Sequence, residues 1–159
     1  PTRIACFKNM TKSDPVNATV KKFGHPQTLL ATVGAWQVLV RPKQATLGAL
    51  VLAHSGPAER FSDLAAIDMT DLGTAVRRIE TALAGAFAYD KINYLMLMMV
   101  DPHVHFHVLP RYARPRDFEG TSFADSGWPG PPDLGAGHAA DAALIEALRT
   151  AIRSHWPDG

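Results

Sequence analysis

The first third of the chain carries short apolar runs separated by residues that interrupt regular structure. After a polar stretch over residues 1–27, the runs are TLLATVG (28–34), WQVLVRP (36–42) and LGALVLAH (47–54). Each run is bounded by glycine, proline or charge, and runs of this length rich in Val and Leu are typical of β-strands. The pattern predicts three neighbouring strands joined by hairpin connections, preceded by an irregular arm.

The spacing of apolar positions changes at Asp68, the candidate N-cap of a helix. Apolar residues then recur every three or four positions, which predicts an amphipathic helix. They are Leu72, Val76, Ile79, Leu83 and Phe87. A second stripe of this kind in residues 141–156 predicts a terminal helix docked through one face. It consists of Leu144, Leu148 and Ile152.

Two more strands are predicted between these helices. INYLMLMMV (92–100) is apolar almost throughout, as in a strand covered on both faces, and its methionines are expected to fill the core. Residues 104–112 alternate as a strand with one polar face. Between Arg114 and His138, frequent Gly and Pro predict a loop without regular structure. This order of elements describes an α+β domain with a mainly antiparallel sheet.

Composition narrows the class of protein. Hydrophobic residues make up 47% of the 159 residues and charged residues 19%, as in a single globular domain. The net charge is +1, without a long basic run, so neither a nucleic acid nor a membrane surface is an expected partner. The single cysteine, Cys6, cannot form an internal disulfide. With no signal peptide or membrane span in the pattern, we expect a cytoplasmic protein.

The chemistry concentrates in DPHVHFHVLPRY (101–112), which holds three of the seven histidines at every second position. In a strand, side chains two apart project from the same face about 6.6 Å apart. The imidazoles of His103, His105 and His107 are therefore predicted to line one surface. Their interleaved neighbours Val104, Phe106 and Val108 face the core and hold the row in place.

Two kinds of chemistry fit such a row. Imidazole is a common zinc ligand, but the third histidine lies about 13 Å from the first along the strand, so a metal site would need a distant ligand. The other possibility is phosphoryl chemistry, in which one imidazole attacks phosphorus and its neighbours neutralise the phosphate oxygens.

HVHFHVL resembles the His-φ-His-φ-His-φ-φ signature of the histidine triad (HIT) superfamily, where φ is apolar. ERFSDL (59–64) is similar to the segment before the helix in the diadenosine-polyphosphate hydrolase branch. The resemblance covers residues 23–114, which implies a HIT-like fold with a five-stranded sheet, one long helix across it and a C-terminal helix. It leaves an N-terminal arm (1–22) and a Gly/Pro-rich extension with the terminal helix packed on the domain (115–159).

The resemblance implies a catalytic role for the three histidines. His105 would attack the α-phosphate of a nucleoside polyphosphate or phosphoramidate, and water would cleave the nucleotidyl-histidine intermediate. His103 and His107 would assist at the phosphate and leaving-group oxygens. No metal site or required cofactor is expected, and a divalent cation would enter only with the substrate phosphates. The family also implies a small nucleotide substrate and a homodimer.

Candidate nucleotide contacts lie outside the triad. They are Arg41, Arg111 and Trp36. Arg41 stands where family members usually present Asp or Asn to the ribose, and Ala49 stands where that branch has a fourth histidine. His54 and His25 are candidates to replace the lost donor, although a structural role is the more common one for a single histidine. The phosphate-contacting loop before the triad is expected to be missing, because only Asp101 and Pro102 separate the predicted strand from the triad.

Two alternatives to an enzyme stay open. A HIT domain with these departures would be a nucleotide-binding module with little turnover. A protein of a different class would be a zinc-binding β protein that uses the histidine cluster.

Overall fold

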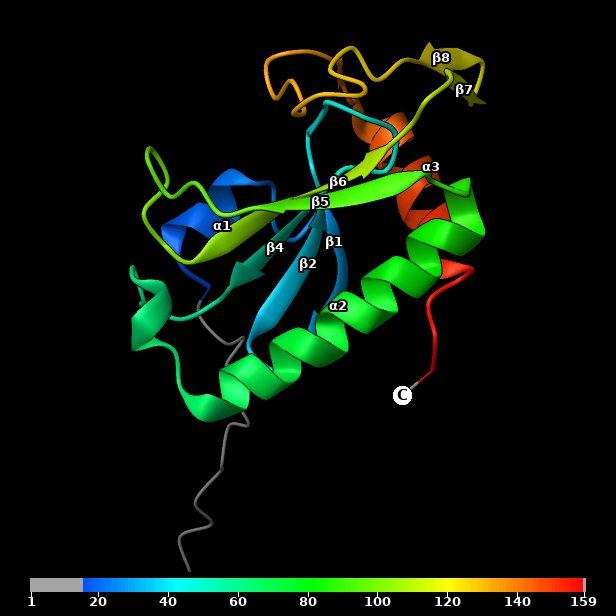
Figure 1. The fold of residues 1–159 in the computed structure, drawn as a ribbon. Coiled ribbons are helices and arrows are strands. Elements are labelled where there is room, and N and C mark those ends of the chain that lie inside the picture. Colours follow the sequence, from blue (N-terminus) through cyan, green and yellow to red (C-terminus); the bar gives the residue numbers. More distant parts are fainter. Residues whose placement is uncertain (1–15, 159) are drawn as a thin grey trace, which may run out of the picture.

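A computed structural model describes residues 16–158 of the chain. Its centre is a five-stranded antiparallel sheet in the order β1-β2-β4-β6-β5. The strands are β1 (Leu29–Val33), β2 (Trp36–Val40), β4 (Leu50–His54), β5 (Lys91–Leu95) and β6 (His105–Arg111). Helices α2 (Ala66–Phe87) and α3 (Ala142–Arg153) pack against β1 and β2, whereas the short α1 (Ala18–Lys22) contacts β4. Figure 1 shows α2 running obliquely along the sheet and α1 on the side away from it. The predicted α+β class and antiparallel sheet are confirmed.

Hairpin connections form where the apolar runs predicted them. Residues Gly34 and Ala35 join β1 to β2, with Val33 opposite Trp36. Gly34 has φ +55°, and a Cβ atom there would meet the Asp71 carboxylate of α2 at 2.1 Å. Only glycine fits this turn, because both the backbone conformation and the close approach of the helix exclude a side chain.

Helix α2 begins earlier than its capping pattern predicted. The first helical residue is Ala66, and Asp68 lies in the first turn, where its carboxylate accepts a hydrogen bond from the Ala65 amide at 2.9 Å. Asp68 therefore caps backward from inside the helix instead of occupying the N-cap, since an acidic side chain satisfies free amides from either position. The sheet side of α2 is apolar, with Ile79 and Leu83 fully buried.

The sheet is covered on both faces, and the alternation along its strands assigns each residue to one face. The residues under α2 and α3 include Val38, Val40, Leu50, Leu52 and Val108. The residues of the opposite face include Leu39, Val51 and Ala53, which pack against Val20 of α1. Both β2 and β4 are buried along their whole length for this reason.

The described part of the N-terminal arm is ordered, which corrects the expectation of an irregular segment. Asn17 caps α1 by accepting from the Val20 amide at 3.0 Å. Its side-chain amide also donates to the carbonyl oxygens of His54 and Gly56, at 2.8 and 2.7 Å. One polar side chain thus starts the helix and attaches it to the end of β4. Cys6 lies outside the described residues.

Strand β5 is shorter than the apolar run 92–100 that predicted it. It ends at Leu95, which pairs with His107, and residues 96–104 form a loop that returns to β6. A strand continued to residue 100 would run past the first residue of β6 and lose its hydrogen-bonding partner. The prediction that no loop of useful length precedes the triad is therefore wrong. The prediction of core methionines fails for Met99, whose side chain is 88% exposed.

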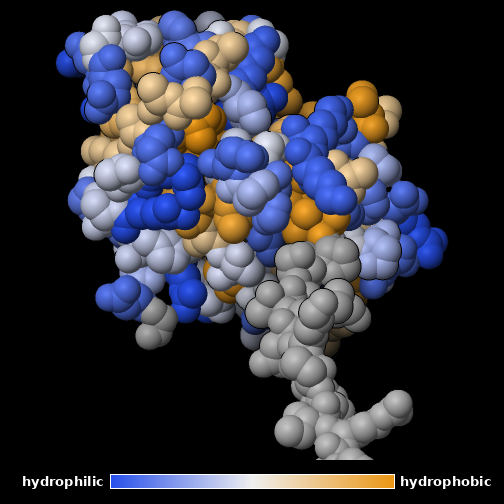
Figure 2. Space-filling model, turned by 180° about the vertical axis from the view of Figure 1, so that it is seen from behind, coloured by the Kyte–Doolittle hydropathy of each residue, from blue (hydrophilic) through white to orange (hydrophobic). Residues whose placement is uncertain are grey.

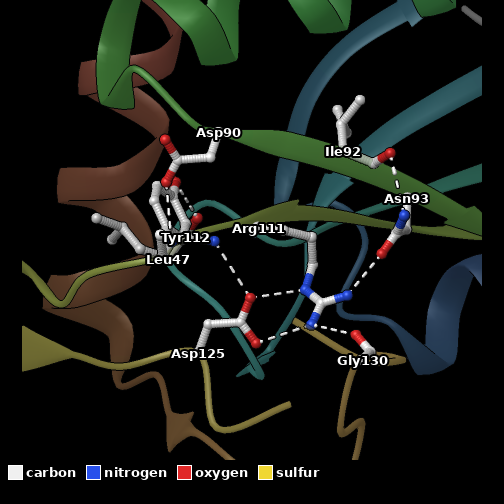
Figure 3. A network of polar contacts seen from close by, with 9 residues as sticks. Leu47, Asp90, Ile92, Asn93, Arg111, Tyr112, Asp125 and Gly130 are labelled. Atoms are coloured by element: carbon white, nitrogen blue, oxygen red, sulfur yellow. Dashed lines mark hydrogen bonds and ion pairs between the residues drawn. The ribbon is translucent and has the colours of Figure 1, made fainter. Parts of the chain in front are cut away.

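The Gly/Pro-rich segment is attached to the sheet through a buried ion pair (Figure 3). Arg111, 4% exposed, donates from Nε and Nη2 to the two carboxylate oxygens of Asp125, at 2.7 and 3.1 Å. Its remaining contacts are Nη1 to Asn93 Oδ1 at 2.7 Å and Nη2 to the Gly130 carbonyl at 2.9 Å. The bidentate geometry and the added hydrogen bonds offset the cost of burying the charges.

Beyond this ion pair, the segment adds two small sheets before the terminal helix. They pair β7 (Arg116–Phe118) with β8 (Thr121–Phe123), and β3 (Lys43–Gln44) with β9 (His138–Ala139). In α3, Leu148 and Ile152 are fully buried against the core, as the stripe predicted, and Ile145 joins them. No helix in residues 16–158 has the length and apolar character needed to cross a membrane.

Candidate active site

Two of the three histidines lie on β6 and the third lies just before it. His105 and His107 occupy one face of the strand and are 1% and 7% exposed. His103 precedes the first strand residue, so the row is not a single extended segment as predicted. Val104 still bridges to neighbouring backbone, donating to the Ala58 carbonyl at 3.0 Å and accepting from the His54 amide at 3.0 Å. Backbone hydrogen bonds to two other segments therefore fix the residue that leads into β6.

The protonation of His105 follows from its hydrogen bond. Its Nδ1 lies 2.7 Å from the carbonyl oxygen of His103. A carbonyl oxygen only accepts, so Nδ1 carries the proton and Nε2 keeps a free lone pair. The local backbone, bent just before the strand, thus supplies the tautomer that a nucleophilic imidazole requires.

His107 carries its proton on the other nitrogen. The Nε of Arg41 donates to His107 Nδ1 at 3.3 Å. A guanidinium only donates, so Nδ1 must accept and the neutral ring carries its proton on Nε2. Burial, the positive charge of Arg41 and the neighbouring His105 lower the pKa of His107 to about 4, against an opposing effect of Asp101. His107 is therefore neutral near pH 7, with Nε2–H available as a hydrogen-bond donor.

The two imidazoles form an edge-to-face pair with opposite proton placement. Their ring centres are 5.2 Å apart and their planes make an angle of 82°. One ring presents a lone pair at Nε2 and the other presents an N–H at Nε2. The backbone carbonyl of His103 thus fixes the nucleophile, and Arg41 fixes the hydrogen-bond donor beside it. Among the described hydrogen bonds, none joins a carboxylate to either ring.

Helix α1 covers the row from one side. The Oγ1 of Thr19 lies 2.9 Å from Nδ1 of His103, and Phe23, just after the helix, packs against both other rings at 5.6 and 5.8 Å between centres. The motif could not reveal these contacts. Asn17 is a signal for a helix start at this point, but no pattern in the arm indicates where that helix docks.

Arg41 is the one nucleotide-contact candidate that the fold brings to the triad. It is half-buried, and besides His107 it donates from Nη1 to the Lys43 carbonyl at 2.6 Å. None of the ion pairs within residues 16–158 includes Arg41. The other two candidates lie elsewhere: Trp36 is fully buried on the α2 face and donates to the Asp68 carbonyl, and Arg111 is engaged with Asp125. Their positions do not support the expectation that they contact a nucleotide.

Neither the position of Ala49 nor that of His54 supplies a fourth histidine. Ala49 is fully buried on the triad face of the sheet, beside Leu109. His54 points to the opposite face, where its Nδ1 accepts from the Gly56 amide and its Nε2 lies 3.0 Å from the Asp68 carboxylate. That contact lowers the pKa of Asp68. The candidate role of His54 as a replacement donor is therefore wrong, because strand alternation turns it away.

A cavity of about 130 Å³ opens beside the pair of imidazoles. Its walls are residues 97–101 of the loop and the side chains of His105 and His107. Larger hollows lie elsewhere, such as one of about 790 Å³ between β5 and residues 128–132. Within the described residues, no group of three or more His, Cys, Asp or Glu side chains is arranged to hold a metal ion. The zinc hypothesis therefore gains no support from the geometry.

Several solved structures share this fold. A histidine triad protein from Sinorhizobium meliloti 1021 matches with a TM-score of 0.70 and 18% identity over 88% of this chain and 95% of its own. A histidine triad protein from Bradyrhizobium japonicum matches with a TM-score of 0.68 and 23% identity over 89% and 96%. The Plasmodium falciparum diadenosine triphosphate hydrolase matches with a TM-score of 0.61 and 13% identity over 81% and 76%.

The sequence itself also matches a family model. Residues 36–114 match the HIT domain, and this segment includes four of the five sheet strands, α2 and the complete triad. The chain therefore belongs to the HIT family, whose members generally act on nucleotides. A comparison with curated protein sequences gives no match.

Proposed function

We propose that this protein is a nucleotide hydrolase or nucleotidyl transferase that acts at the α-phosphate of a nucleoside polyphosphate or phosphoramidate. The reaction passes through a covalent nucleotidyl-histidine intermediate on His105. The observation that carries the proposal is the opposite proton placement in His105 and His107, which puts a free lone pair and an N–H donor on adjacent rings. Nucleophilic attack needs the first and stabilisation of phosphate charge needs the second.

In the first step, Nε2 of His105 forms a bond to the α-phosphorus and the bond to the leaving group breaks. His107 Nε2–H donates to a phosphate oxygen. Arg41 lies next to this point with a positive charge that no carboxylate in the described residues neutralises, so it stabilises the same oxygens. The backbone carbonyl of His103 stabilises the positive charge that develops on the His105 ring.

The leaving group takes up one proton as it departs, and the water that then attacks phosphorus gives one up. We assign both transfers to His103, which donates the first proton and accepts the second. The hydrogen-bond partners of the other two rings fix their tautomers, whereas the Thr19 hydroxyl beside His103 Nδ1 can accept as well as donate. His103 can therefore hold protons on both nitrogens. Attack by water breaks the P–Nε2 bond and releases the mononucleotide.

The test is a substrate panel with a search for the intermediate. Dinucleoside polyphosphates, nucleoside phosphoramidates and adenylyl sulfate are incubated with the protein, and a mononucleotide is expected from at least one. Mass spectrometry of the quenched protein is expected to locate a nucleotidyl adduct on His105. His105→Ala abolishes both signals, whereas His155→Ala, at an exposed histidine of the C-terminal segment, retains them. Turnover that survives in His105→Ala would refute the mechanism.

A second candidate function is nucleotide binding with little turnover. It is favoured by the burial of His105, which is 1% exposed, and by the small volume of the adjoining cavity. Binding of a mononucleotide by calorimetry, with no product across the panel, would support this candidate over the enzyme. The cytoplasmic location, the homodimer and the lack of a required cofactor stay predictions. Sedimentation velocity tests the homodimer.

A further inference from the structure

One peptide unit links the nucleophile to a segment that lies outside the triad. The carbonyl oxygen of His103 accepts from His105 Nδ1 at 2.7 Å. The amide of Val104 donates to the Ala58 carbonyl oxygen at 3.0 Å. This carbonyl and this amide belong to the same peptide unit, which is planar, so neither group can turn without the other. The position of Ala58 therefore fixes the carbonyl that keeps the proton of His105 on Nδ1.

Ala58 lies in the 55–58 segment, which follows β4 and has no helix or strand of its own. Hydrogen bonds at Gly56 hold this segment in place. The Gly56 amide donates to His54 Nδ1 at 3.1 Å, and the Gly56 carbonyl oxygen accepts from Asn17 Nδ2 at 2.7 Å. Two side chains therefore fix the backbone two residues before Ala58, at a glycine whose conformation would otherwise be free.

The ring of His54 is itself held in one orientation on the α2 side of the sheet. It is 8% exposed, packs edge-on against Trp36 with 5.3 Å between ring centres, and places Nε2 at 3.0 Å from the Asp68 carboxylate. A backbone amide only donates, so Nδ1 accepts from Gly56 and the neutral ring carries its proton on Nε2. Because strand alternation turns this ring away from the triad, its contribution there is the position of Gly56.

The second attachment of the segment comes from α1. Figure 1 shows this short helix on the other side of the sheet from α2, and Figure 2, seen from behind, shows small apolar areas separated by polar side chains. Two of the five residues of α1 are buried, so apolar contact alone gives the helix little to hold it. Asn17 adds polar contacts, donating to the carbonyl oxygens of His54 and Gly56 at 2.8 and 2.7 Å. The 55–58 segment is thus held from both sides of the sheet.

We propose that His54 is a positioning residue for the nucleophile His105. It acts through the 55–58 segment, which sets the plane of the peptide unit before Val104 and with it the tautomer of the His105 ring. The inference rests on the proposed function and adds to it a residue that does not touch the substrate. Without the acceptor at His54 Nδ1, the segment loses a constraint and the peptide unit turns. Part of the His105 rings then carry their proton on Nε2, where it blocks attack on phosphorus.

Two substitutions separate the roles of the two ring nitrogens of His54. Asn has an oxygen near the position of Nδ1, so His54→Asn keeps an acceptor for the Gly56 amide and loses the group that faces Asp68. Gln has its amide nitrogen near the position of Nε2, so His54→Gln keeps a donor toward Asp68 and loses the acceptor. Both variants remove the ring that packs against Trp36, and similar losses of thermal stability are expected from both.

The protonation of His105 is measured by NMR of ¹⁵N-labelled histidine rings, because the shifts of the two nitrogens show which one carries the proton. In the wild type and in His54→Asn the proton is expected on Nδ1. In His54→Gln about half of the molecules should carry it on Nε2. The ring also loses its fixed orientation, so kcat should fall about tenfold in His54→Gln while KM changes less than about twofold.

A second variant reaches the segment without changing His54. Asn17→Asp keeps the N-cap of α1 but removes the donor to Gly56, so the proton of His105 should move in the same direction as in His54→Gln. The matched control is His138→Gln, the same replacement at an exposed histidine of β9. It should leave both the His105 tautomer and kcat unchanged.

The outcomes separate this proposal from the proposed function. A proton that stays on Nδ1 of His105 in folded His54→Gln, or in Asn17→Asp where His54→Gln does not fold, would overturn the positioning role. Equal changes in His54→Asn and His54→Gln would overturn it as well, since the acceptor for the amide would then be irrelevant. A proton that moves as expected, in a protein without turnover or adduct on His105, would support the coupling and refute the proposed function.

Discussion

Arg41 helps to keep His107 neutral, and removing it should raise the pKa of this imidazole. The side chain donates to His107 Nδ1 and adds a positive charge beside the ring. Both effects disfavour protonation of the imidazole, as does its burial. Arg41→Met removes the donor and the charge while retaining a long apolar side chain.

The size of the effect follows from the lowering of the His107 pKa. That pKa falls from an ordinary 6.5 to about 4, with burial as the largest cause and Arg41 as the next. Arg41 accounts for part of this lowering, so in Arg41→Met the pKa of His107 should rise from about 4 toward its ordinary value.

The titration of the His107 ring reports this change. The imidazolium form keeps the Nε2–H that donates to phosphate, so the expected effect is a higher pKa of the ring and not the loss of this donor. NMR titration of ¹⁵N-labelled histidine measures the same pKa directly and does not depend on turnover.

Stability should respond with a matching sign. The folded protein keeps His107 neutral below pH 6.5, whereas the unfolded chain binds a proton there, so the free energy of unfolding falls between pH 6.5 and about 4. This group contributes a loss of about 3 kcal/mol over that range, and the loss should be smaller in Arg41→Met. Urea denaturation across this pH range tests the difference.

Two controls isolate the cause. Arg41→Lys keeps the charge, so the pKa of His107 should stay near its wild-type value, and Arg77→Met removes an exposed arginine of α2 without effect on that pKa. A His107 pKa in folded Arg41→Met that equals the wild-type value, or lies below it, would refute the assignment of Arg41 as a residue that holds His107 neutral.

Three further substitutions test the fold and the site. Asp125→Ala leaves Arg111 buried without its partner and should lower the free energy of unfolding by about 3–5 kcal/mol in urea, whereas a loss below about 1 kcal/mol would show that the pair is solvated. Leu52→Ala removes a fully buried side chain and should cost about 2–5 kcal/mol, again by urea denaturation; an unchanged midpoint would contradict its core position. Thr19→Val removes the hydroxyl beside His103 and should lower kcat with little change in stability, so an unchanged kcat would argue against His103 as the proton carrier.

The periodic patterns predicted the elements better than their ends. The run 92–100 reads as one buried strand, yet β5 ends at Leu95, opposite His107 of β6. Apolar character is a property of single residues, whereas the length of a strand depends on the strand beside it. For the same reason the sequence did not predict the loop that lines the cavity, since core methionines and methionines on an exposed loop cannot be distinguished by their pattern.

The sequence also predicted only part of the candidate site. The triad could be predicted because alternation brings residues two apart to one face, and Arg41 was singled out from its position at the end of the second strand. Trp36 and Arg111 were also named as candidate nucleotide contacts from sequence, but the structure places one under α2 and buries the other against Asp125. Thr19 and Phe23 carried no signal at all.

What the sequence by itself determined was the α+β class, the position of the long helix and the row of histidines, because each depends on local periodicity. The tertiary structure decided the protonation of His105 and His107, the position of α1 over the row, and the exposure of the loop at residues 97–100. These features arise where segments distant in the chain meet, as Arg41 of the β2 end meets His107 of β6. Contacts of that kind set which nitrogen carries a proton and which surface a substrate encounters, and no pattern of neighbouring residues encodes them.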